Sequence, residues 1–240
     1  SANDAAIQVK NKALKLASIL LEKPEDELEL SDGAVRARSD SNQFITLADL
    51  ALQLSPAVAG KLPEGFETAG LEAVSYQTTD YMPHSSGANI AKVEVDVVTG
   101  GIKILDYYVV HDCGRILNPM IVDGQIIGGV VHGIGNAMFE QMVYDDSGNP
   151  MTTNYGDYLL PLASEMPEIH VAHIETPSPA NPMGLKGAGE GGTIPAIGAM
   201  INAIEDALTP FDAYIAKYPV TPEYILCLLY TSPSPRDRPL

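Results

Sequence analysis

Residues 183–202 read MGLKGAGEGGTIPAIGAMIN, a glycine-rich segment that runs directly into an apolar one. Five glycines between 184 and 192 surround one lysine and one carboxylate, Lys186 and Glu190. Glycine suits positions where the backbone takes a positive φ angle or lies against a ligand. Pro195 stands where the first turn of a helix tolerates proline, before a helical run over 196–208. The segment predicts a loop that carries one acid to a helix N-terminus, where backbone N–H groups favour an anion.

Two interpretations of this loop are open. A glycine-rich loop before a helix is often only a tight turn, and Glu190 is then an ordinary acid favoured by the helix dipole. The other interpretation is a loop that presents its carboxylate to a ligand. The usual phosphate-loop patterns do not apply, because Lys186 precedes the core glycines and no strand leads into the segment.

Length and composition permit one large domain or two small ones, since the chain has 240 residues of which 45% are hydrophobic. The formal net charge of −17 argues against nucleic-acid binding and against anionic membranes. No apolar run reaches the roughly 20 residues that span a bilayer, so we expect no membrane span. The two cysteines, Cys113 and Cys227, predict neither a disulfide framework nor a metal cluster.

Both ends of the chain look non-native. The first residue is Ser1 and no signal peptide is visible, so we expect a cytoplasmic protein whose native N-terminus is missing. Near the other end, VTPEYIL (220–226) begins a final helix, whereas CLLYTSPSPRDRPL (227–240) resembles read-through of a sequencing adaptor, as in gene fragments from environmental (metagenomic) DNA. We therefore expect a domain over 1–226 and a non-native or disordered tail over 227–240. A genuine Pro/Ser-rich disordered tail is the alternative.

The first third of the chain predicts helices and one hairpin. Alternating residues around Asp32-Gly33 indicate a β-hairpin over 28–38. The other expected segments are an amphipathic helix over 5–22, a short helix over 45–54 and a Pro/Gly-rich loop over 55–67.

Strand patterns then follow. One strand is expected over 73–81, and two alternating runs over 89–113 are joined at Thr99-Gly100-Gly101, a strong hairpin pattern. The second run ends in His111-Asp112-Cys113-Gly114. Adjacent side chains on a strand point to alternate faces, so this cluster indicates a turn at the strand end in preference to a metal site.

A long helix is expected from Asn118-Pro119 through Tyr144, and its interior contains five glycines. Each glycine costs about 1 kcal/mol relative to alanine in an exposed helix interior. Close packing of small residues explains such a pattern, and so does a large cofactor lying against the helix. Gln125 lies among these glycines and is suited to hydrogen-bond the edge of a heterocycle.

The last part of the chain again contains patterns typical of strands and turns. We expect a turn over 145–149, strands over 155–162 and 169–174, and an extended linker TPSPANP (176–182) before the glycine loop. No repeat and no clear interdomain linker is visible. The order of elements predicts an α+β fold, or mixed α/β.

Three segments in this order resemble one family. They are AKVEVDVVTGGIKILDYYVVHDCGRILNP (91–119), GQIIGGVVHGIGNAMFE (124–140) and PSPANPMGLKGAGEGGTIPAIGAMINAIEDA (177–207). Together they resemble the C-terminal part of the molybdenum-binding large subunit of molybdenum hydroxylases, the group of xanthine dehydrogenase, aldehyde oxidase and aerobic carbon monoxide dehydrogenase. The resemblance covers residues 5–226 and is closer to the bacterial carbon monoxide dehydrogenase type.

The resemblance implies roles for individual residues. Glu190 matches the family's catalytic glutamate, a general base beside the metal, and Gln125 matches a glutamine that hydrogen-bonds the molybdopterin. The remaining cofactor-binding candidates are Lys186, Gly187, Ala188 and Gly189 beside the pterin, and Ser86, Gly87 and Asn89 at the cofactor's tail. If this is right, Gln125 and Glu190 face one cleft of ~300–1,000 Å³.

The resemblance also implies cofactors and partners. These are a molybdenum–molybdopterin in its cytosine dinucleotide form, iron–sulfur clusters and FAD on partner subunits, a dimer of heterotrimers, and a small substrate such as CO, an aldehyde or an N-heterocycle. The family's other cofactor loops lie upstream of Ser1, so we expect an oxidoreductase fragment that is inactive alone. A catalytically silent cofactor-binding or assembly module and an unrelated α+β structural domain are the alternatives.

Overall fold

The computed structural model describes residues 1–57, 62–79 and 81–230. The chain forms two compact units, Ser1–Thr78 and Thr79–Leu240. The sequence shows no linker between them, and the two units were expected as one domain. The boundary lies in a segment without helix or strand, within the region 73–81 that the sequence pattern assigned to a strand.

The first unit packs two helices against a small antiparallel sheet. Its elements are α1 (Ala2–Leu21), β1 (Leu28–Ser31), β2 (Ala34–Ala37), β3 (Asp40–Thr46) and α2 (Leu47–Gln53). The expected hairpin is confirmed, with positive φ angles at Asp32 and Gly33 in its turn. β3 was not expected. Leu16, Val35 and Leu50 lie in the core of this unit.

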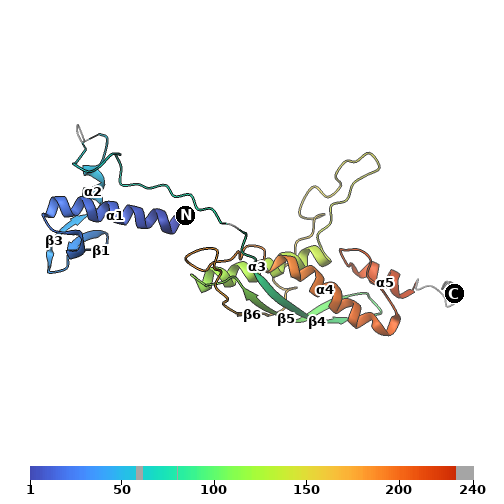
Figure 1. The fold of residues 1–240 in the computed structure, drawn as a ribbon. Helices are drawn as coiled ribbons and strands as arrows, with labels where there is room; N and C mark the ends of the chain where they lie inside the picture. Colours follow the sequence, from blue (N-terminus) through green and yellow to red (C-terminus); the bar gives the residue numbers. More distant parts are fainter. Residues whose placement is uncertain (58–61, 80, 231–240) are drawn as a thin grey trace. The chain divides into compact units, whose positions relative to one another are not determined.

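The second unit has a three-stranded sheet in the order β4-β5-β6. β4 (Ser86–Val95) and β5 (Ile102–Asp112) form the predicted antiparallel hairpin, and β6 (Ile169–His173) is parallel to β5. Two helices, α3 (Pro119–Met138) and α4 (Thr193–Leu208), cover one face of this sheet (Figure 1). Their apolar residues share one core with the strands.

Helices α3 and α4 approach closely because glycines lie between them. A Cβ on Gly133 would lie 2.5 Å from the Cβ of Ala196, and a Cβ on Gly129 would lie 3.0 Å from the nitrogen of Thr193. Close packing therefore accounts for these two positions. Gly124 and Gly128, in contrast, have no atom within 4 Å of an added Cβ, so packing within this structure does not explain them.

Two predicted strands are wrong. The described part of 73–81 contains no strand, and 155–162 forms turns with Tyr155 and Leu162 exposed. Figure 1 shows the second segment within a long loop that leaves the sheet. A strand requires a pairing partner as well as a suitable pattern, and neither segment has one. The turn over 145–149 is confirmed by the Asp145 carboxylate, which accepts from the backbone of Ser147 and Asn149.

The last helix, α5 (Pro222–Tyr230), continues past Leu226, where the sequence places the end of the domain. Leu228 and Leu229 pack against the core of the second unit. Residues 231–240 lie outside the described residues, so the nature of the expected tail stays a prediction. Among the described residues, none of the helices has the length and apolar character needed to cross a membrane.

Candidate functional site

The glycine-rich loop is attached to the end of β5. Gly114 and Leu185 form an isolated antiparallel bridge, and the Lys186 N–H donates to the carbonyl of Cys113 at 2.8 Å. The Arg115 N–H donates to the carbonyl of Gly184 at 3.1 Å. Gly114 has a φ of 70°, and a Cβ there would overlap the Gly184 carbonyl. The strand-end turn predicted at 111–114 thus becomes the anchor of the loop.

Asn181 closes the start of the loop. Its side-chain amide donates to the Leu185 carbonyl at 2.8 Å, and its side-chain oxygen accepts from the Leu185 N–H at 2.9 Å. This residue lies in the segment expected as an extended linker, and no role was predicted for it. The Asn181 side chain makes the two hydrogen bonds that a neighbouring strand residue would make, and this fixes the conformation at the start of the loop.

Lys186 belongs to a polar cluster with the buried Asp112 and the exposed Thr176. Its Nζ lies 3.1 Å from Oδ2 of Asp112 and 2.6 Å from Oγ1 of Thr176. The Thr176 hydroxyl also donates to Asp112, as does the Gly114 N–H. Burial raises the pKa of Asp112, but the hydrogen bonds from Thr176, Gly114 and Lys186 outweigh it and hold that pKa well below its usual range. The Lys186 side chain therefore anchors the loop.

A cavity of about 480 Å³ lies beside this anchor. It is lined by Ser85–Gly87 at the start of β4, His111 of β5, residues 187–191 of the loop, and Ile194 and Pro195 of α4. Two expected groups, Ser86-Gly87 and Gly187–Glu190, are thus brought to one place from distant parts of the sequence. Within the described residues, the amides of 187–190 donate to no acceptor. Glu190 itself is exposed.

Three expected site residues do not line this cavity. Lys186 is engaged with Asp112, and Asn89 accepts a hydrogen bond from the Tyr107 hydroxyl at 2.9 Å. Gln125 is exposed on α3, next to Ile126, whose carbonyl abuts Gly192. The shared cleft of Gln125 and Glu190 stays a prediction.

His111 lines the cavity, although its sequence context predicted only a turn at the strand end. It is 1% exposed, and neither ring nitrogen has a hydrogen-bond partner among the described residues. Burial and the neighbouring His173 lower its pKa, against the opposing effect of Asp112. The sequence showed His111 at the end of an alternating strand, but its proximity to the glycine loop is a tertiary contact that no local pattern indicates. In the part of the chain that the structure describes, no group of three or more His, Cys, Asp or Glu side chains could hold a metal ion.

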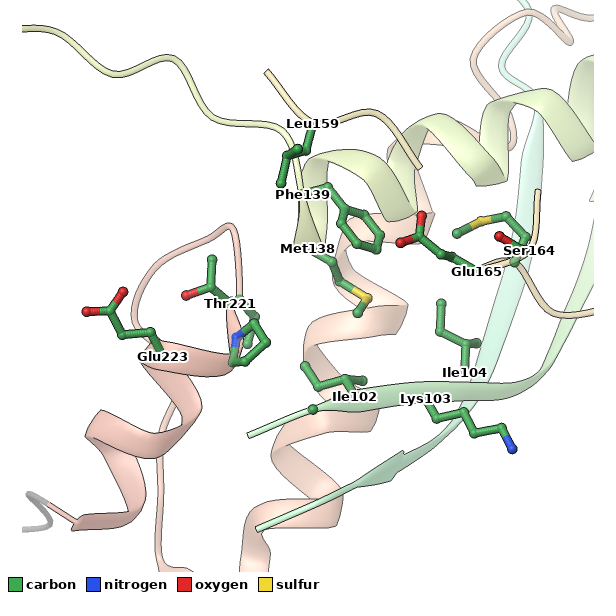
Figure 2. Close-up of a pocket in the computed structure, with 14 residues that line it drawn as sticks. Ile102, Lys103, Ile104, Met138, Phe139, Leu159, Ser164, Glu165, Thr221 and Glu223 are labelled. Atoms are coloured by element: carbon green, nitrogen blue, oxygen red, sulfur yellow. The ribbon is translucent and has the colours of Figure 1, made fainter. Parts of the chain in front are cut away.

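A second, larger cavity of about 780 Å³ lies at the other end of β5. In Figure 2, Ile104 of β5 and Met138 and Phe139 at the end of α3 point toward a common space, with Thr221 and Glu223 near its rim. Apolar side chains dominate this lining. None of the expected site residues contributes to it.

Comparisons with known proteins agree with these features. A family model described as molybdopterin cofactor-binding domain matches residues 1–167. The chain is 41% identical to the nicotine 6-hydroxylase large subunit of Paenarthrobacter nicotinovorans over 93% of this chain and 27% of that subunit. It is 36% identical to the carbon monoxide dehydrogenase large chain of Hydrogenophaga pseudoflava over 85% of this chain and 25% of that one.

Solved structures give the same result. Quinoline 2-oxidoreductase from Pseudomonas putida 86 matches with a TM-score of 0.74 and 37% identity, over 95% of this chain and 29% of that chain. The chain thus spans about a quarter of the length of the curated relatives that it matches. The expected α+β fold and the resemblance drawn from the three segments are confirmed.

Proposed function

The chain belongs to the family of molybdenum hydroxylase large subunits, and we propose that it supplies the cavity in which Glu190 acts as the general base of a molybdenum-dependent oxidoreductase. The observation that carries the proposal is the lining of the 480 Å³ cavity. Glu190 is the one carboxylate among its lining residues, and the same lining contains unpaired backbone amides and a buried imidazole.

The lining residues fit an anionic, flat ligand such as a molybdopterin. The free amides of 187–190 are suited to donate hydrogen bonds to the anionic oxygens of a phosphate or a similar group. Gly191 and Gly192 let the loop lie directly on His111 and on the backbone of α3, where any Cβ would overlap. Ser86 and Gly87 also line the cavity, and Gly87 pairs with His111 across the β4–β5 ladder. We propose that Gly187, Ala188, Gly189, Ser86 and Gly87 hold the cofactor.

The cofactor, when bound, supplies the redox chemistry. The carboxylate of Glu190 takes up a proton from the reacting group and needs hydrogen-bond reach and exclusion of water to do so. Glu190 is exposed in this structure, so we propose that the ligand and the remainder of the large subunit cover it. Lys186 and Asp112 hold the loop in position and take no part in the proton transfer.

Gln125 and Asn89 are proposed as further cofactor contacts on the resemblance alone. We also propose the cytosine dinucleotide form of the cofactor, partner subunits with iron–sulfur clusters and FAD, a dimer of heterotrimers, a cytoplasmic location, and no turnover by this segment in isolation. Two of the relatives are named for nicotine and quinoline, which are N-heterocycles. We therefore place an N-heterocycle ahead of CO or an aldehyde as substrate.

Glu190→Gln in the full-length subunit with its partners tests the base. The variant keeps the shape and hydrogen-bonding reach of the side chain but removes its basicity. Molybdenum content per subunit should be unchanged, because the loop amides are intact. The rate of the reductive half-reaction should fall by ~10²–10⁴-fold. Glu165→Gln, which removes a carboxylate from the lining of the larger cavity, is the matched control and should stay within about twofold of the wild type.

A fully loaded Glu190→Gln enzyme that is nearly as fast as the wild type would remove the base role. Glu190 would then be an acid at a helix start. A wild-type subunit that carries molybdenum but oxidises no member of the three substrate classes would favour a silent cofactor-binding module.

A further inference from the structure

His111 is a buried polar side chain with no partner inside the protein. Both ring nitrogens are shielded from solvent and neither makes a hydrogen bond among the described residues. Its neighbour His173 differs, because Nε2 of His173 lies 2.6 Å from Oδ1 of Asp123 on α3. A buried polar group without a partner is destabilising and rare in native proteins, so it requires an explanation.

The position of the ring supplies that explanation. His111 lies on the lining of the Glu190 cavity, and its imidazole is held between two glycines. An added Cβ on Gly87 would lie 3.6 Å from Cδ2 of His111, and one on Gly191 would overlap Nε2. A side chain at 191 would displace the ring, whereas a Cβ at 87 would make only an ordinary contact with it. Gly191, which directly follows the proposed base Glu190, therefore lets the ring keep this orientation.

The ring is neutral near pH 7, since burial and His173 lower the pKa of His111. A neutral imidazole has one N–H donor and one acceptor nitrogen. The amides of 187–190 make no hydrogen bond among the described residues and belong to the same cavity lining, so acceptor oxygens on a ligand would have further donors available there. Molybdopterin carries such oxygens in its phosphate and in its pterin ring.

We propose that His111 is a cofactor-binding residue, whose ring N–H donates to an oxygen of the molybdopterin in the Glu190 cavity. The proposal rests on the function proposed above and adds a contact that none of the family motifs indicated. His111 thereby gains the hydrogen-bond partner that the protein does not provide.

The test uses the full-length subunit with its partners in four forms: wild type, His111→Leu, His111→Gln and the control His170→Leu. Leucine is close to histidine in volume and lacks polar atoms, whereas glutamine keeps an N–H donor. His170 lies on β6, half-buried and stacked on Tyr108 at 4.7 Å, outside the cavity lining. Molybdenum and released pterin are measured per subunit after gel filtration, and thermal unfolding is measured on cofactor-free protein.

After gel filtration at the same protein concentration, His111→Leu should contain about fivefold less cofactor per subunit than the wild type. Its cofactor-free form should unfold at the same temperature or higher, because an unpaired imidazole has been replaced by an apolar side chain. His111→Gln should recover part of the cofactor content, and His170→Leu should load fully.

Full loading of His111→Leu would overturn the proposal. So would a lower unfolding temperature for cofactor-free His111→Leu with no recovery in His111→Gln, because His111 would then be structural. If both the wild type and His111→Leu contain the full amount of molybdenum, the His111 contact is refuted and the proposed function is not. A wild type without molybdenum refutes the proposed function together with it.

Discussion

The two cavities of the second unit lie at opposite ends of β5 and differ in what lines them. The first residues of the strand, Ile102 and Ile104, line the larger cavity of about 780 Å³. His111, near its end, lines the smaller one of about 480 Å³. Apolar side chains dominate the larger lining, which has Lys103, Glu165 and Glu223 among its other members. The smaller lining instead combines several glycines with one imidazole and one carboxylate. Volume therefore does not locate the chemistry; convergent polar groups do.

The two linings are also held differently. The glycine loop is joined to β5 by backbone hydrogen bonds at Leu185 and Lys186 and by the buried pair of Lys186 with Asp112. One wall of the larger cavity comes from the exposed loop that contains Leu159 and Glu165. A site for chemistry requires groups held in place, and the smaller cavity combines an anchored loop with a carboxylate and a buried imidazole.

Of the substitutions at the smaller cavity, Gly191→Val should have the largest effect. The added side chain would overlap the His111 ring, so we expect a loss of about 3 kcal/mol in the free energy of unfolding of the full-length subunit. Cofactor content should fall as well. Gly187→Ala is the control, since no atom lies within 4 Å of a Cβ there. Equal unfolding curves for Gly191→Val and Gly187→Ala would show that the ring does not press on the loop.

Lys186→Met should have an intermediate effect. Removing the ammonium leaves the buried Asp112 carboxylate without its charged partner, which should cost about 2 kcal/mol of stability. Molybdenum content should decrease before the rate per loaded site does, because Lys186 positions the loop. Lys103→Met, an exposed lysine at the larger cavity, should change neither quantity. A slow but fully loaded Lys186→Met enzyme would contradict this positioning role.

Gly128→Ala should have the smallest effect and the opposite sign on stability. Gly128 is exposed on α3 with open space around it, so alanine should stabilise the helix by about 1 kcal/mol. If the cofactor lies along this face near Gln125, molybdenum content should fall. Gly198→Ala on α4, also in open space, should stabilise without changing the content. Full loading of Gly128→Ala would remove the cofactor explanation for this glycine.

Several features of the fold follow from neighbouring residues alone. The β4–β5 hairpin was predicted from alternation on both sides of Gly100, which takes a φ of 71° in the turn. The start of α3 was predicted from Asn118, whose side chain accepts from the Ile121 N–H at 3.3 Å. These structures are stabilised by short-range geometry, and a short stretch of sequence contains that information.

Other features depend on contacts between distant segments. No local pattern shows that the Lys186 ammonium pairs with Asp112, or that Gly191 rests on His111. The same dependence explains the two strands wrongly predicted over 73–81 and 155–162, because a strand forms only where another strand is available to pair. The residue types of the site could be read from the chain. Which of them face the cavity and which hold the loop depends on β5 bringing His111 and Asp112 beneath residues 184–191, through hydrogen bonds and packing that act between remote parts of the sequence.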